Sequence, residues 1–301
     1  MATSYAERLQ RWLGRVDADA LVEDVLAAAG SMPRDAVARM VEDYVGEALA
    51  GIALLEDGLP ATGARLLEVG SGAGLLVRFF RSEGFDVVGI EPAIAEGFGF
   101  MHSLDRAVGR QVDGVAEPIG RPATAGSLHD AELDRFDLVY SLNVIEHVAD
   151  LPRAFTGMAR VLAPAGRIIH VCPSYRVPYE PHFGLPLVPA APSLTRRLFA
   201  RRIDARSDFW NGLNFVTAGR LRTIAAREGL DVTFRPGVMA STFARLGTDP
   251  AFRRRHGALS ALAGSRVTAD AIEATLRRLP AAWQSPMIAE LRFATTPCAT
   301  C

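Results

Sequence analysis

The sequence predicts a doubly wound α/β fold with a mostly parallel sheet, N-terminal helices and two insertions. Short apolar strands alternate with helices from residue 65 onward, and a glycine-rich turn joins the first strand to the helix that follows it. The first 57 residues show helical rather than strand periodicity. Because a strand, a helix and a second strand follow one another directly, the first two strands should run parallel.

Bulk composition is that of an ordinary globular protein. The chain has 301 residues, of which 49% are hydrophobic and 22% are charged, which suits one core with additions. A formal net charge of -1 gives no bulk attraction to nucleic acid. The sequence shows neither a signal-peptide core nor an apolar run long enough to span a bilayer, so a cytoplasmic location is expected.

The basic and sulfur-containing residues exclude several chemistries. All 33 basic residues are Arg, so Schiff-base lysines, lysine general bases and phosphate-binding Gly-Lys-Ser/Thr loops are excluded. Three cysteines, Cys172, Cys298 and Cys301, do not make a disulfide framework and suit a reducing compartment. The terminal Cys298-x-x-Cys301 pair offers two of the four ligands of a structural zinc, and we interpret it as a tail.

The elements can be assigned in order along the chain. Helical spacing over residues 5–57 predicts an N-terminal helical cap, residues 1–60, ahead of the main domain, residues 61–301. In that domain we predict strands at 65–69, 85–90, 136–141, 167–172 and 230–235, and helices at 75–83, 152–162 and 217–228. Residues 164–166 should form a turn, and residues 287–296 a closing strand.

Two stretches interrupt this alternation. Residues 173–211 contain six prolines followed by an arginine-rich segment, and such a proline-rich run inside a domain indicates an insertion or lid. Residues 245–285 have helical spacing and form a second, helical insertion. No internal repeat is present.

The most specific motif is the glycine loop after the first strand, Leu66-Leu-Glu-Val-Gly-Ser-Gly-Ala-Gly74. Glycines at 70, 72 and 74 allow a tight turn between strand and helix and let a ligand approach the backbone closely. The following helix N-terminus offers unpaired N–H groups. A loop of this kind is shared by several classes of nucleotide site.

Three neighbouring residues narrow the choice of ligand. The dinucleotide fingerprint needs a third glycine at position 75, where Leu75 stands. Glu68, just before the loop, repels a pyrophosphate and suits a cationic ligand. Glu91 ends the second strand, where a carboxylate can accept both hydroxyls of a ribose.

Four segments in this order resemble the class I S-adenosylmethionine (SAM)-dependent methyltransferases, whose core is a Rossmann-like sheet. They are Glu68-Val-Gly-Ser-Gly-Ala-Gly74, Gly89-Ile-Glu-Pro92, Phe136-Asp-Leu-Val-Tyr-Ser-Leu-Asn-Val-Ile-Glu-His-Val148 and Arg160-Val-Leu-Ala-Pro-Ala-Gly-Arg167. The likeness covers about residues 60–175 and is greatest to the subgroup with ubiquinone-biosynthesis O-methyltransferases and many natural-product and sugar enzymes. It continues more loosely through Leu213-Asn-Phe-Val-Thr217.

The resemblance implies the cofactor SAM and a role for each matching residue. Glu68 with the loop residues Gly70, Ser71, Gly72 and Gly74 would face the methionine part. Glu91 and Pro92 would lie at the ribose, and Asn143 would close over the cofactor. Ser127 and Leu128 would meet the adenine, although relatives usually carry Asp where Ser127 stands. An alternative register places Ala116-Glu117 there.

Two histidines are candidates for the catalytic base. His147 follows the 136–141 strand, and His182 lies in the 173–211 insertion within Glu180-Pro-His182-Phe-Gly-Leu-Pro186. His147 could equally cap or pack the next helix. In the ubiquinone subgroup a Glu-His pair like Glu146-His147 is associated with a divalent metal. Relatives there carry a further upstream carboxylate where this chain has Asn143, so we expect no metal.

The arginine-rich segment has several readings. Arg196, Arg197, Arg201, Arg202 and Arg206 alternate with apolar residues and should form one basic helix. This helix could be a solvated face, capture a phosphate-bearing acceptor or contact an anionic membrane surface.

The sequence therefore predicts a SAM-dependent methyltransferase acting on a small acceptor (a sugar, a natural product or a lipid-linked compound) in bacterial secondary metabolism, most simply by O-methylation. The alternatives are a SAM-binding scaffold without catalysis and a nicotinamide-dependent oxidoreductase, against which Leu75 argues.

Overall fold

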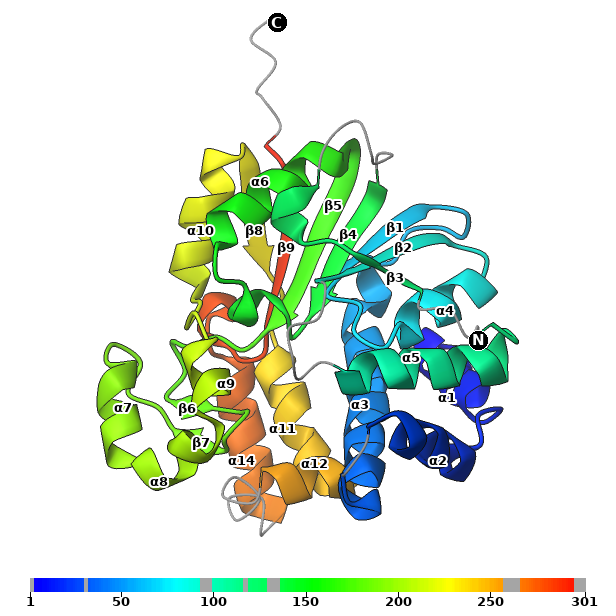
Figure 1. Cartoon of the computed structure of the whole chain (residues 1–301). Coiled ribbons are helices and arrows are strands. Elements are labelled where there is room, and N and C mark those ends of the chain that lie inside the picture. Colours follow the sequence, from blue (N-terminus) through cyan, green and yellow to red (C-terminus); the bar gives the residue numbers. More distant parts are fainter. Residues whose placement is uncertain are drawn as a thin grey trace, which may run out of the picture. The chain divides into compact units, whose positions relative to one another are not determined.

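A computed structural model of the chain describes residues 3–29, 32–92, 99–115, 119–128, 136–256 and 266–294. Seven strands of these residues form the main sheet, in the order β3-β2-β1-β4-β5-β9-β8 (Figure 1). Their bounds are β1 Arg65–Val69, β2 Asp86–Glu91, β3 Gly120–Pro122, β4 Phe136–Leu142, β5 Leu162–Cys172, β8 Leu230–Phe234 and β9 Met287–Phe293. β1 pairs in parallel with β2 and β4, whereas β8 and β9 are antiparallel. The predicted doubly wound, mostly parallel sheet is confirmed.

The strand order reverses between β1 and β4, and ligands of open α/β sheets bind outside the carboxyl ends of the strands at such a point. β1 ends at Val69, directly before the glycine loop. β4 ends at Leu142, directly before Asn143 and the Glu146-His147 pair. The two segments that the sequence singles out therefore leave the carboxyl ends of strands that pair with each other.

Helices begin where the sequence supplies caps or glycines. The Ser4 side chain accepts the Glu7 N–H in a capping box, and Thr217 and Asp249 cap later helices. Outside the proline-rich segment, the α-helices are α1 Tyr5–Leu13, α2 Ala18–Ala29, α3 Arg34–Leu55, α4 Leu75–Ser82, α5 Gly99–Val112, α6 Leu151–Val161, α10 Ala218–Arg227, α11 Val238–Thr248, α12 Pro250–Arg255 and α14 Arg266–Arg277. The predicted N-terminal helices and closing strand are confirmed.

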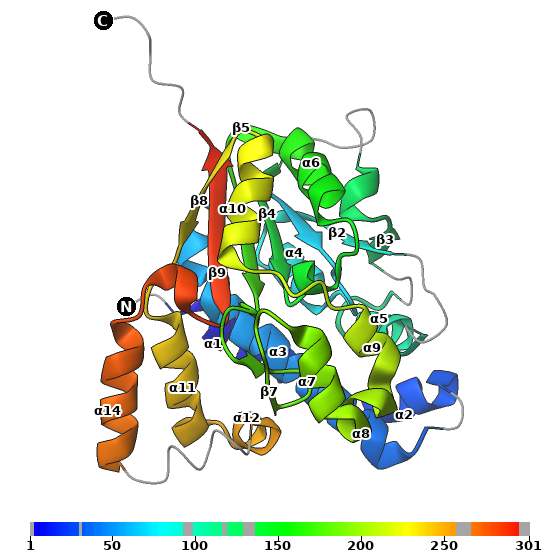
Figure 2. The same cartoon turned by 90° about the vertical axis from the view of Figure 1, so that its left-hand side faces the viewer.

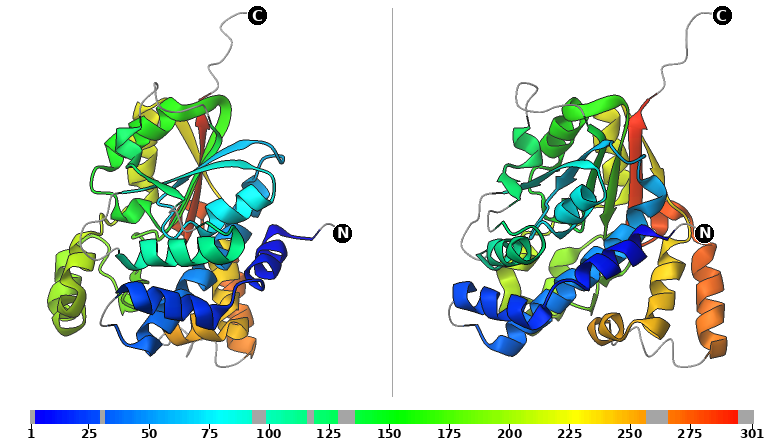
Figure 3. Two further views of the ribbon diagram at one scale, coloured as in Figure 1. Left: turned by 45° about the vertical axis from the view of Figure 1, so that its right-hand side comes forward. Right: turned by 90° about the vertical axis from the view of Figure 1, so that its right-hand side faces the viewer.

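The chain groups into two compact units, each described here by itself. The first comprises residues 1–141 and 160–169. Within it α2 packs against α3 and α5 (Figure 3), and α4 packs against β2. Its core contains an aromatic cluster in which the Phe80 ring lies 5.5 Å from Phe79 and 5.9 Å from Tyr140. This packing fixes Tyr140, on β4, beside the residues that precede the glycine loop.

The second unit comprises residues 142–159 and 170–301. Here α10 packs against β8 and β9, and α11 packs against α12 and α14 (Figure 2). The proline-rich segment stays out of the main sheet. It forms a separate two-stranded sheet, β6 Tyr179–Glu180 with β7 Leu185–Pro186, followed by the short helices α7 Pro192–Leu198, α8 Ala200–Ile203 and α9 Ser207–Asn211.

Three expectations about elements need correction. The turn expected at 164–166 lies inside β5, where Gly166 lets the chain pass close to the Phe136 carbonyl oxygen. The prediction of a single basic helix is wrong, because Phe199 leaves helical geometry (φ -117°, ψ 29°) and separates α7 from α8. The second helical stretch begins at Val238, earlier than predicted, since Gly237 adopts a left-handed conformation that starts α11.

Among the described ranges, no helix combines the length and the hydropathy that crossing a bilayer requires. Two expectations lie outside those ranges. They are the alternative adenine register at residues 116–117 and the Cys298/Cys301 pair.

Candidate functional site

The glycine loop after β1 has the geometry that its sequence predicts. Gly70, Gly72 and Gly74 have φ values of 72°, 51° and 65°, in the left-handed region that favours glycine. A Cβ on Gly72 would overlap the hydroxyl of Tyr44 from α3, and a Cβ on Gly74 would overlap Ile119. Two of the three glycines are therefore required by close packing as well as by backbone conformation.

Tyr44 was not selected from the sequence, yet it braces this loop. Its hydroxyl donates to the Ser71 carbonyl oxygen at 3.2 Å and accepts the Ala73 N–H at 2.7 Å. No motif marks this residue, because a tyrosine in an amphipathic helix is usually core. An alignment that includes the N-terminal helices could have shown it.

Glu68 is a buried carboxylate on β1, with 5% of its surface exposed. The pKa of Glu68 is raised to about 8, mainly by burial; the hydrogen bond from the Tyr140 hydroxyl opposes the rise and the charge of Glu91 adds to it. Within the described residues, no hydrogen-bond partner reaches its Oε2 atom. Such a group is stabilised by a cation, so it suits the ammonium group of a methionyl ligand.

Glu91, at the end of β2, also faces the loop. Its Oε2 atom accepts the Gly72 N–H at 2.9 Å, and the residue stays half-buried. Burial raises its pKa, whereas the Gly72 hydrogen bond and His102 lower it. One carboxylate oxygen therefore fixes the loop, and the group retains acceptor capacity for hydroxyls.

The other expected cofactor residues lie in varied surroundings. Ser71 is 2% exposed, and its Oγ atom lies where Cβ atoms on Gly89 or Gly120 would collide with it. The Ser127 hydroxyl donates to the Thr124 carbonyl oxygen at 2.9 Å and so closes a local turn. Leu128 is buried, and Pro92 is exposed after β2.

Asn143 directly follows β4 and belongs to the second unit. It has a φ of 53°, a conformation that Asn tolerates better than most residues, and it is exposed. Its N–H donates to the Val171 carbonyl oxygen at 2.8 Å.

Within the first unit, the loop, Glu68 and Glu91 fit a cationic nucleoside such as SAM. The loop leaves no room for side chains, the buried acid lacks a described partner at one oxygen, and the second acid stands where a ribose is bound in this topology. The chemistry of these donors and acceptors matches the expected cofactor.

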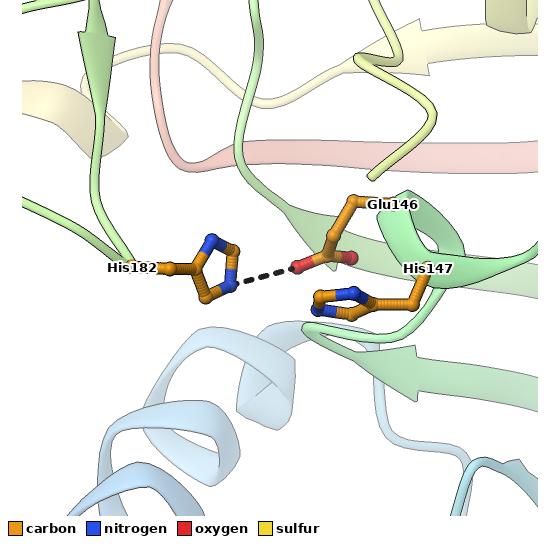
Figure 4. A group of neighbouring side chains, drawn as sticks. All are labelled: Glu146, His147 and His182. Carbon is orange, nitrogen blue, oxygen red and sulfur yellow. Dashed lines mark ion pairs between the residues drawn. The ribbon is translucent and has the colours of Figure 1, made fainter. Parts of the chain in front are cut away.

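In the second unit the structure brings together the two histidines that the sequence named. Glu146, His147 and His182 each place a ligand atom within 4.8 Å of the others (Figure 4). The Glu146 carboxylate points toward His182, and its Oε1 atom lies 3.8 Å from Nε2 of that ring. The rings of His147 and His182 are 5.2 Å apart. Burial, with a smaller effect of His182, lowers the pKa of His147 to about 4 against the opposing charge of Glu180, so His147 is neutral at pH 7.

His182 is oriented by a fully buried carboxylate, that of Glu180. His182 Nδ1 lies 2.6 Å from Glu180 Oε1, and Glu180 Oε2 accepts the Phe183 N–H at 2.7 Å. The tight β6–β7 pairing places the two residues on one hairpin. Because one imidazole nitrogen is held in this way, the other, Nε2, is the atom that faces the Glu146 carboxylate.

Several aromatic side chains lie in the segment that carries His182. Tyr175, Phe183 and Trp210 are buried, while Tyr179 bonds to His256 at 2.8 Å. Phe209, which the sequence analysis did not select, lies 5.0 Å from the His147 ring and 5.1 Å from the His182 ring. It remains 37% exposed and so is the apolar surface next to the two histidines.

The arginine-rich segment supports the same hairpin. Arg206 donates to the His182 carbonyl oxygen at 2.5 Å, and Arg202 to the Phe183 carbonyl oxygen at 3.2 Å. Leu194 and Leu198 are 45% and 64% exposed on α7. Two of the five arginines are therefore used in holding the backbone beside His182.

Comparison with known proteins identifies the family to which this chain belongs. A family model described as "Methyltransferase domain" matches residues 39–233. An uncharacterized protein of Mycobacterium tuberculosis strain H37Rv is 34% identical over 228 residues, which cover 73% of each chain. A ubiquinone biosynthesis O-methyltransferase of Alkalilimnicola ehrlichii is 33% identical over 128 residues, 42% of this chain and 45% of that protein.

Among solved structures, an S-adenosylmethionine-dependent methyltransferase from Mesorhizobium loti has a TM-score of 0.50 and is 20% identical. The match covers 81% of this chain and 97% of that one. At this identity the likeness concerns the fold.

Proposed function

The chain belongs to the class I SAM-dependent methyltransferases, and from this premise we propose that it methylates a hydroxyl oxygen of a small acceptor. The nicotinamide-dependent alternative and the scaffold without catalysis are set aside by the family. The acceptor class, whether sugar, natural product or lipid-linked compound, stays a proposal, as do the predicted domain boundaries and membrane contact through the segment from Arg196 to Arg206.

The observation that carries the proposal is the Glu180–His182 pair beside Glu146 and His147. SAM supplies an activated methyl group, so the protein mainly aligns the acceptor and excludes water. A hydroxyl acceptor must also lose its proton, which an amine in its free-base form need not do before attack. An imidazole oriented by a buried carboxylate is the arrangement by which proteins accept such a proton.

The residues divide into two tasks. In the first unit Glu68, the glycine loop and Glu91 bind the cofactor. In the second unit His182 accepts the acceptor proton at Nε2, and Glu180 positions that ring. His147 and Phe209 lie against His182 and give the acceptor a polar and an apolar contact.

The test combines binding and turnover. Isothermal titration with SAM and with NAD should give binding of SAM alone. A methyl-transfer assay should then compare matched acceptors that carry a hydroxyl or an amine on the same skeleton. Turnover confined to the hydroxyl series is expected, and transfer only to amines would overturn O-methylation.

Replacing Glu91 with Ala should weaken SAM binding by about 10- to 100-fold. The variant loses charge-assisted hydrogen bonds to the ribose, each worth about 1.5–3 kcal/mol, although water can partly replace them at a half-exposed site. Glu91→Gln, which keeps one acceptor oxygen, should fall between parent and Ala. Titration calorimetry measures both, and a Glu91→Ala chain that binds SAM as tightly as the parent would refute the ribose assignment.

Glu68→Gln should affect binding and stability in opposite directions. The folded chain keeps a proton on Glu68 up to a pH of about 8, whereas the unfolded chain releases it near its ordinary pKa of about 4.3. Between these values the folded state binds more protons, so the parent's free energy of unfolding falls as pH rises. Gln does not titrate, so the free energy of unfolding of Glu68→Gln does not fall with pH for this reason.

Urea unfolding at pH 5 and pH 8 measures the difference without SAM. From pH 5 to pH 8, the free energy of unfolding of Glu68→Gln should rise relative to that of the parent by roughly a few kcal/mol. Its SAM affinity at pH 8 should nevertheless fall more than about tenfold, because the ammonium group loses its carboxylate. A stability difference that is the same at both pH values would contradict the buried, protonated state.

A further inference from the structure

The Glu146, His147 and His182 cluster has a composition that proton transfer alone does not require. Three ligand atoms of two types converge within 4.8 Å: a carboxylate oxygen and one nitrogen from each of two imidazoles. Two ligand atoms that share one ion at bonds of about 2.1 Å lie roughly 3–4 Å apart. The 3.8 Å separation between Glu146 Oε1 and His182 Nε2 is within that range.

We propose that Glu146, His147 and His182 bind one divalent cation of the zinc class, with Glu180 positioning His182. The sequence argued against a metal because Asn143 stands where relatives have a carboxylate. His182, 39 residues further along the chain, supplies the third ligand instead, since the β6–β7 hairpin brings it to the Glu146-His147 pair.

Glu180 gives an independent indication of a ligand at His182. Metal-binding histidines commonly donate their second ring N–H to a carboxylate, which fixes the tautomer and raises the basicity of the other nitrogen. His182 has this contact at 2.6 Å to a carboxylate that is 0% exposed. Its remaining nitrogen is the one directed at Glu146 (Figure 4).

Charge also favours a cation. Glu146 and Glu180 are both fully buried, and the attraction between a carboxylate and a cation is stronger in such surroundings than in water. A divalent ion at the three ligand atoms would therefore be held by charge as well as by coordination.

The ligand set selects the kind of ion. Two imidazoles and one carboxylate suit Zn²⁺ and similar transition ions, whereas Mg²⁺ prefers oxygen ligands. Three protein ligands leave a coordination position open, as in catalytic zinc sites. Without the cation, Nε2 of His182 is free to accept the proton as proposed above. With the cation bound, His182 is a ligand, the cation lowers the pKa of a hydroxyl that reaches it, and the hydroxyl proton passes to solvent water. This role rests on the proposed function, but the binding does not.

The experiment titrates metal-free protein with Zn²⁺ and, separately, with Mg²⁺ by calorimetry. The background is Cys298→Ser/Cys301→Ser, so that the terminal thiols do not bind the probe. One Zn²⁺ per chain is expected, with much weaker Mg²⁺ binding. Glu146→Gln, His147→Ala and His182→Ala should each abolish tight binding, and Glu180→Gln should weaken it by about 10- to 100-fold. His102→Gln is the matched control and should bind as the parent does.

Folding of each variant is checked by its melting temperature. If His182→Ala does not fold, His182→Asn and Glu180→Gln provide the test. Co²⁺ should give a ligand-field absorption band that disappears in the same variants. Zn²⁺ binding that is unchanged in Glu146→Gln and His182→Ala overturns the site.

The two proposals fail separately. Protein freed of metal by a chelator is tested first. If it binds no Zn²⁺ but still methylates a hydroxyl acceptor at the parent rate, the metal site is overturned and O-methylation is supported. Zn²⁺ binding that depends on the three residues, with methyl transfer to amines alone, supports the metal site and overturns O-methylation.

Discussion

Gly72→Val should abolish measurable SAM binding, which corresponds to a loss of more than about 100-fold in affinity or about 2.8 kcal/mol. The residue has a φ of 51°, where a β-branched side chain is strongly disfavoured, and its Cβ would overlap the Tyr44 hydroxyl. Either the loop or Tyr44 must move. Both outcomes break the hydrogen bonds that Ala73 and Gly72 make to Tyr44 and Glu91.

The measurement is titration calorimetry with SAM, together with circular dichroism to establish folding. Gly219→Val is a matched control, because a Cβ on this α10 glycine meets nothing within 4 Å. Gly72→Ala with Tyr44→Phe separates the two causes: relief of the hydroxyl overlap should restore part of the affinity if crowding dominates. A folded Gly72→Val chain with parental affinity would place the cofactor elsewhere.

His182→Ala should lower turnover by about 10²- to 10⁴-fold, the range for loss of a positioned acid or base, while SAM affinity stays within a few-fold. The side chain belongs to the second unit, and its contacts are with Glu180, Glu146, His147 and Phe209. None of these residues is expected to bind the cofactor. A kcat loss without a change in SAM affinity therefore indicates a role toward the acceptor.

Ser193→Ala, an exposed position in the same segment, is the control and should behave as the parent. Glu180→Gln should lower kcat less than His182→Ala, because the ring keeps a hydrogen-bond partner without its charge. A His182→Ala enzyme with parental turnover on its true acceptor removes His182 from the site. It would also leave the 173–211 segment without its expected role as an acceptor lid.

The fold and the residues that we propose bind the cofactor could be predicted because the sequence features that indicate them are local. Strand and helix periodicity, capping residues and glycines that need a left-handed backbone act over a few neighbours, so the sequence carries them directly. Glu68 and Glu91 follow from the same logic, since each lies at a fixed distance from the loop. The break at Phe199 and the extension of β5 past Pro164 were missed because packing overrides local preference there.

The sequence by itself determined the order of elements, the glycine loop and the family, and it singled out the two acids that we propose bind the cofactor. Only the tertiary structure brought His182 to Glu146 and His147, paired it with the buried Glu180, and placed Tyr44 on the loop. The physical reason is separation along the chain. The contacts of Tyr44 with the loop and of His182 with Glu146 and His147 join residues 27 to 36 positions apart. They depend on where a helix or a hairpin packs, and neither periodicity nor a short motif encodes that position. Glu180 and His182 are two residues apart, and for this pair the fold decided the burial of the carboxylate.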